Sequence, residues 1–340
     1  MRLDICMDKP PLITLFLFCY NQENYIEKAV YSVLAQDYGN LEIIISDDCS
    51  TDSTFDIIQK IVKKYDGNHR VIINKNTENL GIGGHVNKAF KMALGEFIIF
   101  AAGDDISFPE RVSKIVDRWL ALDKNVSAIY SGARRIDQHG KDCGALDVAI
   151  STINPTAYNL ISYRDSNKKY LLMGASAAYS RDLNNQFGSL LPDVNVEDIP
   201  LTIRASLIHG VSYIHEPLIY YRENVSVWLP RKLKNESFDR HRARLLHRIK
   251  NKYFVAKQIF NDVQFIKANQ QIVKVAKQRL LAVEFIQNCI EKKNFSFLNF
   301  LILSIKIPSY WRYMLFPIIM FANPLLHRMI YKTYMLFKGS

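Results

Sequence analysis

Two pairs of aspartates, Asp47-Asp48 and Asp104-Asp105, each follow a short apolar run of the chain, at 41–46 and 96–101. Such runs are typical of buried strands, and ligands bind in open α/β sheets outside the carboxyl ends of the strands. Crowded carboxylates repel one another unless a cation or a hydrogen-bond donor lies beside them. Because Mg²⁺ is commonly held by one or two carboxylates and substrate phosphates, the pattern predicts a divalent metal that carries a diphosphate. The alternative is a solvated turn after a strand, which Gly-Asp-Asp at 103–105 also suits.

The apolar runs alternate with stretches of helical periodicity over the first 120 residues. Strands alternating with helices predict an α/β fold with a parallel, doubly wound sheet. The pattern is less regular over residues 126–222, and after Pro230 it is helical. We expect strands at 12–20, 41–46, 71–73, 96–101, 127–131 and 211–214. We expect helices at 25–36 (capped by Asn24), 52–62, 85–94 (after a loop at 81–84), from 109 onward, around 168–172 and at 197–208.

The composition is that of a globular protein, with 49% hydrophobic and 23% charged residues among 340. Five cysteines are scattered without the spacing of metal ligands or of a disulfide framework, which favours a reducing compartment. The N-terminal residues do not resemble a signal peptide, and no run of about 18 apolar residues occurs. We therefore expect a cytoplasmic protein without a membrane-spanning helix.

The charge is unevenly distributed along the chain. Residues 230–340 hold 21 Lys and Arg against 5 Asp and Glu, a net charge of +16, whereas the remainder has a net charge of −5. This change predicts a boundary near residues 228–230. The basic region ends in aromatic and apolar residues from Tyr310 onward, which favours an anionic membrane surface as its partner and not nucleic acid. The alternative is a helical region that packs on the rest of the chain or on a second copy, forming a homo-oligomer.

Five short motifs occur in the order and spacing of a known family. They are Leu15–Asn21, Ser32–Gln36, Asp47–Asp52 (with Cys49 in place of a glycine), Asn79–Gly81, and Gly95–Phe100 before Asp104-Asp105. On these motifs the chain resembles the family 2 glycosyltransferases of bacterial polysaccharide and O-antigen synthesis, which have the GT-A nucleotide-sugar-binding fold. The resemblance implies a Rossmann-like GT-A domain over residues 1–229, followed by the helical region 230–340. Its nucleotide-binding half would be at about 11–120 and its acceptor half at about 121–229.

The resemblance also implies roles for individual residues. Asp105 would bind Mn²⁺ or Mg²⁺, and Asp104 would contact the ribose or nucleotide. Asp198, or its neighbour Glu197, would be the general base of an inverting transfer, although two carboxylates at the start of a helix also suit the helix dipole. The other implied nucleotide-sugar contacts are Cys19, Tyr20 (stacking on the base), Asn21, Glu23, Asp47 (accepting a hydrogen bond from the base) and Arg222. The implied acceptor-side residues are Gly174, Ala175 and Ser176.

The predicted function is transfer of one sugar from a nucleotide diphosphate-sugar, with a UDP-sugar favoured, to a hydroxyl of a glycan, with a lipid-linked glycan favoured. Such an enzyme would be peripheral on the inner face of the plasma membrane. The Gln-x-x-Arg-Trp signature of the processive members is absent, which argues against a polymerising synthase. Two alternatives are a catalytically silent sugar-nucleotide-binding or assembly protein and a nucleotidyltransferase. The second is disfavoured because no Gly-rich loop containing Lys or Arg occurs near the N-terminus.

Overall fold

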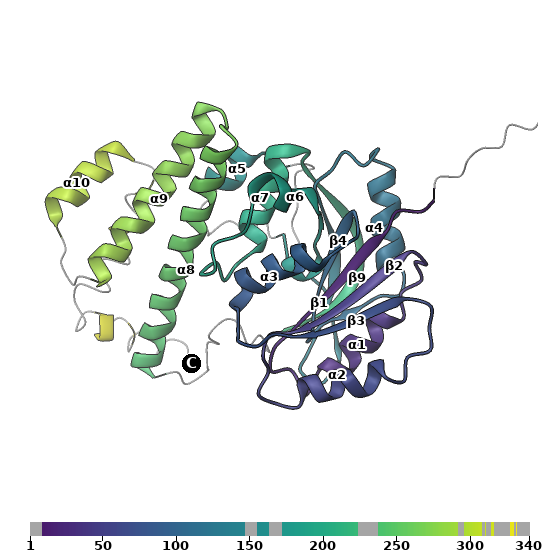
Figure 1. The fold of residues 1–340 in the computed structure, drawn as a ribbon. Coiled ribbons are helices and arrows are strands. Elements are labelled where there is room, and N and C mark those ends of the chain that lie inside the picture. Colours follow the sequence, from purple (N-terminus) through teal and green to yellow (C-terminus); the bar gives the residue numbers. More distant parts are fainter. Residues whose placement is uncertain are drawn as a thin grey trace, which may run out of the picture.

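A computed structural model describes residues 9–146, 155–162, 172–223, 237–291, 296–307, 310, 314–315, 327–329 and 331. Its centre is a mixed sheet of nine strands in the order β3-β2-β1-β4-β8-β6-β9-β5, with β7 paired to β6 (Figure 1). The strands are β1 (Ile13–Cys19), β2 (Leu41–Asp47), β3 (Arg70–Lys75), β4 (Phe97–Ala102), β5 (Ile106–Ser107), β6 (Ala128–Ile136), β7 (Asp142–Ala145), β8 (Ala178–Ser180) and β9 (Val211–Arg222).

Helices cover both faces of this sheet and continue beyond it. They are α1 (Ile26–Leu34), α2 (Thr54–Val62), α3 (Gly81–Met92), α4 (Arg111–Leu120), α5 (Ala157–Ser162), the 3₁₀ turn η2 (Gly174–Ser176), α6 (Asp182–Phe187), α7 (Asp198–Ile208), α8 (Phe238–Phe265), α9 (Gln270–Glu291) and α10 (Phe297–Lys306). The expected helix at 168–172 lies outside the described residues, except for its last residue, Leu172.

The predicted parallel sheet is confirmed for β1 to β4. Strand β1 lies between β2 and β4 and is parallel to both, and β3 is parallel to β2. Successive side chains of a strand point to opposite faces. Leu15 and Leu17 of β1 therefore pack in the core that contains α1, α2 and α4, whereas Phe16 packs in the core that contains α3, α6 and α7. Because both faces are covered at the centre of the sheet, β4 is wholly apolar and β1 is apolar except for Thr14, which made these strands visible in the sequence.

Beyond β4 the sheet is mixed, in the region where the sequence pattern is less regular. Strand β8 is antiparallel to both β4 and β6, and β5 is antiparallel to β9, whereas β6 and β9 are parallel. Strands β8 and β5 are three and two residues long. Segments this short have no readable periodicity, because a strand pattern needs about four residues or more.

Helix α3 begins at Gly81, so the predicted loop at 81–84 is wrong. The backbone N–H groups of Leu80 and Gly81 donate to the Asp48 carboxylate at 2.9 and 3.1 Å. A carboxylate at this place satisfies free N–H groups of the first turn and suits the positive end of the helix dipole. The predicted cap at Asn24 is also wrong, because α1 is preceded by Tyr25 and has no side-chain cap.

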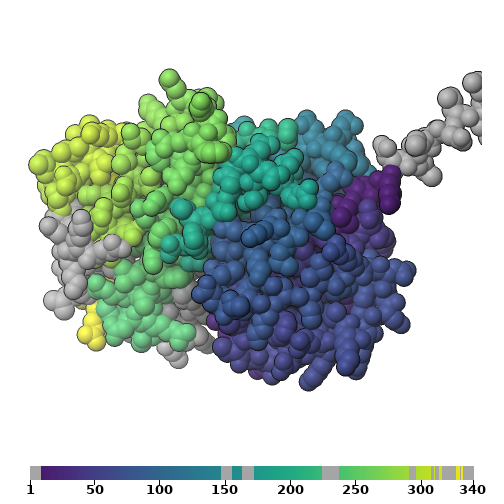
Figure 2. Space-filling model, viewed as in Figure 1, coloured from purple at the N-terminus to yellow at the C-terminus, as the bar shows by residue number. Residues whose placement is uncertain are grey.

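The helical periodicity after Pro230 is confirmed by three helices. Helices α8 and α9 lie side by side, and α10 lies on the outer side of α9, away from the sheet (Figure 1). Val255 and Ile259 of α8 share one hydrophobic core with Ile161 of α5 and Ile203 of α7. In Figure 2 the green surface of α8 and α9 accordingly continues into the teal surface of residues near 180–210.

The predicted boundary at 228–230 and most of the aromatic end after Tyr310 lie outside the described residues. On either side of that boundary, the buried side chains of α7 and α8 belong to the same core. The two regions are therefore packed as one unit at this interface, although their charges differ.

Candidate active site at the carboxyl ends of the strands

A cavity of about 240 Å³ lies at the carboxyl end of β4. Its walls come from the turn after β4, the start of α3, η2, the segment before α7 and the end of β9. The polar side chains that line it are His85, Asp104, Asp105, Asn195, Glu197, Asp198, Tyr221 and Arg222. Segments far apart in the chain thus meet at the sheet edge where the sequence predicts a ligand crevice.

The acidic pair Asp104-Asp105 lies in the turn after β4. The Asp105 carboxylate accepts a hydrogen bond of 2.8 Å from the backbone N–H of Arg222, which ties this turn to the end of β9. Burial raises the pKa of both carboxyl groups, and the neighbouring charge of Asp104 raises the pKa of Asp105 further. A cation beside the pair would relieve the repulsion between two buried negative charges.

The donor set around this pair restricts the kind of metal site that fits. Within the described residues, no group of three or more His, Cys, Asp and Glu side chains is placed to hold a metal ion. A divalent ion at Asp104-Asp105 would therefore need further ligands, and Mg²⁺ commonly takes these from water and substrate phosphates. The pair fits a metal bound together with a diphosphate better than one held by the protein alone.

Arg222 is buried at the end of β9, and its guanidinium group is already bonded to the protein. Its Nε donates to the Asp104 carbonyl at 2.9 Å and its Nη1 to the Asp137 carbonyl at 2.8 Å. The group also lies 4.8 Å from the centre of the Tyr25 ring. Arg222 lines the cavity and supports the acidic turn, while its direct contact with a diphosphate stays a prediction.

The second acidic pair lies on another wall of the cavity, at the start of α7, where Glu197 precedes the helix and Asp198 is its first residue. Asp198 accepts hydrogen bonds from the N–H groups of Ile199 and Gly174. Its Oδ1 is buried and has no hydrogen-bond partner among the described residues. Burial raises the pKa of Asp198 to about 6, and burial together with the Asp198 charge raises the pKa of Glu197 to about 8. Because burial and mutual repulsion disfavour two charges here, the pair holds a proton more readily than two isolated carboxyl groups, and one ionised carboxylate is what a general base requires.

Gly174 of η2 lies against this pair, and we expect Gly174→Ala to impair turnover. A Cβ atom at position 174 would lie 2.6 Å from Oε1 of Glu197, well inside van der Waals contact. The Glu197 carboxylate would have to move away, and displacing a reacting group by about 1 Å costs about 100-fold, so kcat should fall by about 10- to 100-fold in steady-state kinetics. Ser176→Ala is the control, because it removes only a hydroxyl that donates to the Met173 carbonyl and adds no atom beside Glu197. An equal loss in both variants would contradict the steric explanation.

Two residues predicted to contact the nucleotide are buried next to the cavity and do not line it. Cys19 lies at the end of β1, where burial and the charges of Asp47 and Asp104 raise the pKa of its thiol. The Asp47 carboxylate accepts hydrogen bonds from the backbone N–H of Ser50, at 2.9 Å, and from the Ser50 hydroxyl. Their roles toward a nucleotide base stay predictions.

Asn21 and Glu23 join the loop after β1 to the loop after β2. Asn21 has a positive φ of 49° and accepts a hydrogen bond of 2.9 Å from the backbone N–H of Thr51. Glu23 accepts one of 3.0 Å from the backbone N–H of Ser53. These bonds shape the sheet edge, and Tyr20 lies half-buried beside them. The predicted residues that line the cavity are Asp104, Asp105, Gly174, Ala175, Glu197, Asp198 and Arg222, whereas Ser176 is buried and does not line it.

A family comparison agrees with this geometry. Residues 14–188 match the family described as Glycosyl transferase family 2, and this span is more than half of the chain. The chain belongs to this family. The predicted resemblance to the family 2 glycosyltransferases is therefore confirmed. The carboxylates around the cavity can be considered in the light of this family.

Relatives of this glycosyltransferase occur in bacteria. TuaG of Bacillus subtilis, a putative teichuronic acid biosynthesis glycosyltransferase, is 27% identical over 269 residues, which cover 78% of this chain and 95% of TuaG. EpsE of Bacillus subtilis, a putative glycosyltransferase, is 31% identical over 134 residues, or 39% of this chain and 47% of EpsE. WfaP of Escherichia coli, a UDP-Glc:α-D-GlcNAc-diphosphoundecaprenol β-1,3-glucosyltransferase, is 40% identical over 102 residues, or 30% of this chain and 39% of WfaP. This chain spans about half or less of the length of EpsE and of two further relatives.

Solved glycosyltransferase structures share the fold. TarS of S. aureus (residues 1–349, in complex with UDP) has a TM-score of 0.54 at 20% identity, over 91% of this chain and 80% of that one. The mannosyltransferase PcManGT from Pyrobaculum calidifontis, solved with GDP-Man and Mn²⁺, has a TM-score of 0.54 at 19% identity, over 92% and 86%. The predicted GT-A fold with C-terminal helices is thus confirmed.

Arg111 is a residue of the glycosyltransferase site that the sequence analysis missed. It is buried at the start of α4 and donates to the carbonyls of Phe100 and Ala175 at 2.7 and 2.9 Å, so it joins β4 to η2 beside the acidic turn. Burial lowers its pKa to about 10, and it stays a cation at neutral pH. One signal could have revealed it: Arg111 is four residues before Ile115 and so shares the apolar face of the helix.

Two further polar residues were also missed as parts of the site. The side chain of Gln22 hydrogen-bonds to the Asp104 side chain and accepts a hydrogen bond of 3.2 Å from the backbone N–H of Tyr20. His85 lines the cavity, with its Nε2 2.7 Å from the Ser46 hydroxyl oxygen. Burial lowers the pKa of His85 to about 3, so it is neutral at physiological pH. Their partners come from other elements, and spacing along the chain does not reveal such contacts.

Proposed function

We propose that this glycosyltransferase moves a single sugar from a nucleotide diphosphate-sugar to a glycan hydroxyl, with a divalent metal and with inversion at the anomeric carbon. The observation that carries the proposal is the position of two buried acidic pairs, Asp104-Asp105 and Glu197-Asp198, on two walls of one cavity. Such a transfer needs one group that neutralises a diphosphate leaving group and another that accepts a proton. The two pairs suit these two tasks.

Each acidic pair has a defined part in this mechanism. Asp105, with Asp104 beside it, would hold Mn²⁺ or Mg²⁺, which when bound acts as a Lewis acid toward the departing diphosphate. Asp198 accepts the proton of the acceptor hydroxyl, whose oxygen attacks the anomeric carbon from the face opposite the diphosphate. The bond to the diphosphate breaks as the new glycosidic bond forms, so the configuration inverts. Glu197, protonated near neutral pH, leaves Asp198 as the single negative charge of its pair.

The donor that we favour is a UDP-sugar. TarS was solved with UDP, PcManGT with GDP-Man and Mn²⁺, and WfaP is named for UDP-Glc, which supports a nucleotide-sugar. In this chain, Tyr20 directly follows β1, and Asp47 is the last residue of β2. Both lie next to the cavity. They are our candidates for contacts with the base.

The acceptor that we favour is a lipid-linked glycan of bacterial surface polysaccharide synthesis, including O-antigen. TuaG is named for teichuronic acid biosynthesis, and the name of WfaP includes a diphosphoundecaprenol-linked sugar. In this chain the acceptor would enter past Gly174 and Ala175, which lie on the cavity wall with Asp198. A lipid-linked acceptor requires the enzyme to work at a membrane surface.

The C-terminal region has features that suit such a surface. Helix α10 exposes apolar side chains, with Phe297, Leu298 and Ile305 63%, 67% and 80% exposed. Among the described residues, no helix has the length and apolar character that crossing a bilayer demands. Exposed apolar residues in a region of net charge +16 suit attachment to anionic lipids, here at the inner face of the plasma membrane. The alternative occupant of this face is a second copy of the chain.

We expect the full-length protein to pellet with phosphatidylglycerol vesicles and to ignore phosphatidylcholine vesicles. Basic residues contribute about 1 kcal/mol each near an anionic surface, and salt screens this term. Apolar insertion is not screened, so about 1 M salt should release the protein only partly. Leu298→Glu combined with Ile305→Glu should abolish the salt-resistant fraction.

Leu120→Glu is the matched control for this experiment, because Leu120 is exposed on α4 outside the C-terminal region. Equal binding by all variants, or no binding of the wild type at low salt, would contradict membrane attachment. Dimerisation that depends on Leu298 and Ile305 would instead favour a second copy as the occupant.

A donor screen tests the proposed function directly. Purified protein is incubated with individual UDP-, GDP- and dTDP-sugars with Mn²⁺ or with EDTA, and release of the nucleoside diphosphate is measured. We expect release from one or a few donors with Mn²⁺ only. Binding without any release would favour the catalytically silent alternative, and formation of a sugar nucleotide from a nucleoside triphosphate would favour a nucleotidyltransferase.

A further inference from the structure

One face of α8 is buried against the segment of residues 188–197, which leads to the acidic pair of α7. Val255 and Ile259 on this face pack in one core with Val194 of that segment. The same face carries three polar residues, Asn251, Gln258 and Asp262, which are only 3–5% exposed. Buried polar side chains are unfavourable unless they are hydrogen-bonded, so their partners indicate why they are there.

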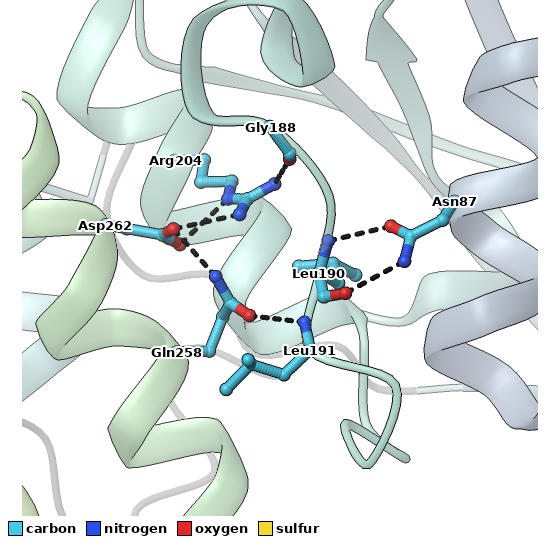
Figure 3. Close-up of polar contacts among 7 residues, drawn as sticks. All are labelled: Asn87, Gly188, Leu190, Leu191, Arg204, Gln258 and Asp262. Atoms are coloured by element: carbon cyan, nitrogen blue, oxygen red, sulfur yellow. Dashed lines mark hydrogen bonds and ion pairs between the residues drawn. The ribbon is translucent and has the colours of Figure 1, made fainter.

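Their partners lie in and around the segment 188–197 (Figure 3). Asp262 accepts two hydrogen bonds of 2.8 Å from the Arg204 guanidinium and one of 2.8 Å from Nε2 of Gln258. The Oε1 of Gln258 accepts a hydrogen bond of 2.7 Å from the backbone N–H of Leu191, and Nη1 of Arg204 donates to the Gly188 carbonyl at 2.9 Å. The polar face of α8 is thus bonded to the backbone of the segment directly at Leu191, through Gln258, and indirectly at Gly188, through Arg204 of α7.

A further contact lies closer to the cavity. Nδ2 of Asn195, which lines the cavity, donates to Oδ1 of Asn251 at 3.3 Å. Residues 251, 258 and 262 of α8 therefore follow the segment along its length, from Gly188 to Asn195.

Helix α3 holds the same segment from the opposite side. The Asn87 side chain both donates to the carbonyl of Leu190, at 2.8 Å, and accepts from its backbone N–H, at 2.7 Å (Figure 3). At Gly83, an added Cβ would lie 2.7 Å from the Leu191 carbonyl oxygen and 2.8 Å from that of Val194. The segment is therefore in close contact with the backbone of α3, and no side chain fits between them.

These contacts act on a segment that has no regular structure of its own. Residues 188–197 form neither helix nor strand, and segments of this kind are usually mobile and exposed. Here Leu190 and Val194 are buried, and the backbone groups of Gly188, Leu190 and Leu191 find partners on α3, α7 and α8. The irregular segment thus has buried side chains and paired backbone groups, as an element of regular structure does.

Stability alone is a weak explanation for the ion pair in this network. Arg204 and Asp262 are 2% and 3% exposed, and replacing a buried ion pair by apolar residues often leaves a protein equally or more stable. A two-pronged guanidinium–carboxylate contact instead fixes relative orientation. The elements so oriented are α7, which begins at Asp198, and α8.

We propose that Gln258 and Asp262 of α8, together with Asn87 and Gly83 of α3, clamp residues 188–197 and so position Glu197-Asp198 relative to Asp104-Asp105. Helix α8 then contributes to the geometry of the active site. The four residues are positioning residues that contact neither the donor nor the acceptor. The inference rests on the proposed function, in which Asp198 is the base. Small errors in the placement of a reacting group are costly, about 100-fold for a displacement of 1 Å.

The test is Gln258→Met, which keeps the length of the side chain and removes its bonds to Leu191 and Asp262. Amide hydrogen exchange is measured for residues 188–200, and UDP binding with Mn²⁺ and UDP release from the sugar nucleotide found in the screen are measured in parallel. We expect faster exchange, kcat lowered about 10- to 100-fold and a UDP dissociation constant within about twofold of wild type. The nucleotide-binding strands β1 to β4 are not part of the clamp, so UDP binding should be spared.

Ile286→Ala is the matched control, because Ile286 is buried in a separate core that contains none of the four clamp residues. It should lower the melting temperature without changing exchange at 188–200 or kcat per folded molecule. The proposal is overturned if exchange increases in Gln258→Met but kcat is unchanged. It is also overturned if kcat falls in proportion to the loss of melting temperature, to the same degree in Gln258→Met and Ile286→Ala.

Gly83→Ala tests the clamp from the other side and does not depend on the folding of the first variant. It should show the same separation of kcat from UDP binding, whereas Gly84→Ala, whose Cβ would meet only the Leu80 Cβ at 3.0 Å, should not. Equal kcat values in the two glycine variants overturn the proposal. If the wild type releases no nucleoside diphosphate from any donor, the proposed function fails, and hydrogen exchange still decides whether α8 holds the segment.

Discussion

Asp198→Asn is expected to lower turnover by about 10²–10⁴-fold, the usual scale for loss of a general base. The amide keeps the shape of the side chain and can still accept from the N–H groups of Ile199 and Gly174, so the start of α7 should be preserved. It cannot accept the proton of the acceptor hydroxyl. UDP binding, measured by calorimetry, should stay near the wild-type level, because Asp198 lies on a different wall of the cavity from Asp104-Asp105, the pair proposed to hold the metal and diphosphate. A variant that loses UDP binding but keeps its kcat would contradict this assignment.

The pH dependence of turnover tests the same residue. Because burial raises the pKa of Asp198 to about 6, the base is protonated and inactive below this pH and ionised above it. Turnover of the wild type should therefore rise as the pH increases through about 6, and this rise should be missing in Asp198→Asn. Glu197→Gln is the matched control: Glu197, with a pKa of about 8, is already neutral at pH 7, so its amide should cost far less. If Glu197→Gln suffers the larger loss, the base is Glu197.

Asp105→Asn is expected to reduce transfer by at least about 100-fold, because Lewis-acid neutralisation of a leaving group is worth several kcal/mol. The amide can still accept the hydrogen bond from the backbone N–H of Arg222, so the link between the acidic turn and β9 is kept. What is lost is one of the two negative charges that would hold the cation.

Calorimetry of UDP with and without Mn²⁺ separates this effect from misfolding. Mn²⁺ should strengthen UDP binding by the wild type and have little effect on binding by Asp105→Asn. Asp142→Asn is the control, since Asp142 is a carboxylate paired with Arg134 and does not line the cavity. Full wild-type activity in excess EDTA, or an unimpaired Asp105→Asn, would contradict the metal role.

The nucleotide-binding half was predictable because its signals are local. The strands at 13–19, 41–47 and 97–102 each contain a run of at least three consecutive apolar residues, and each is followed by polar residues within a few positions. A sheet edge collects the carboxyl ends of such strands, so the acidic turn could be placed before any contact was known.

Contacts between distant segments were not predictable in the same way. Arg111 reaches Ala175, and Gln258 reaches Leu191, across 64 and 67 positions of the chain. Periodicity reports which face of an element is buried and not what covers it. The start of α3 was misplaced for a related reason: Gly81, Gly83 and Gly84 suggest a loop, but the Asp48 carboxylate caps the helix and Gly83 allows close packing.

The charge of the C-terminal region suggests a separate unit, whereas its packing shows that it shares a core with the rest of the chain. Net charge reports on surfaces, and the surface after residue 229 is basic. The core is set by Val255, Ile259 and their neighbours, which pack against Ile203 on the other side of the predicted boundary. Composition could therefore suggest a distinct partner for this region but could not show how it is joined to the rest.

Recombination between related transferases would have to respect this shared core. A chimera with its crossover at residue 229 would combine Arg204 from one parent with position 262 from another, leaving a buried guanidinium without its carboxylate unless both parents carry the pair. A crossover between α8 and α9, at residues 266–269, inherits both members from the same parent. Exchange of α9 and α10 by that second route should preserve catalysis, and under the proposed membrane attachment it should change where in the cell the enzyme works.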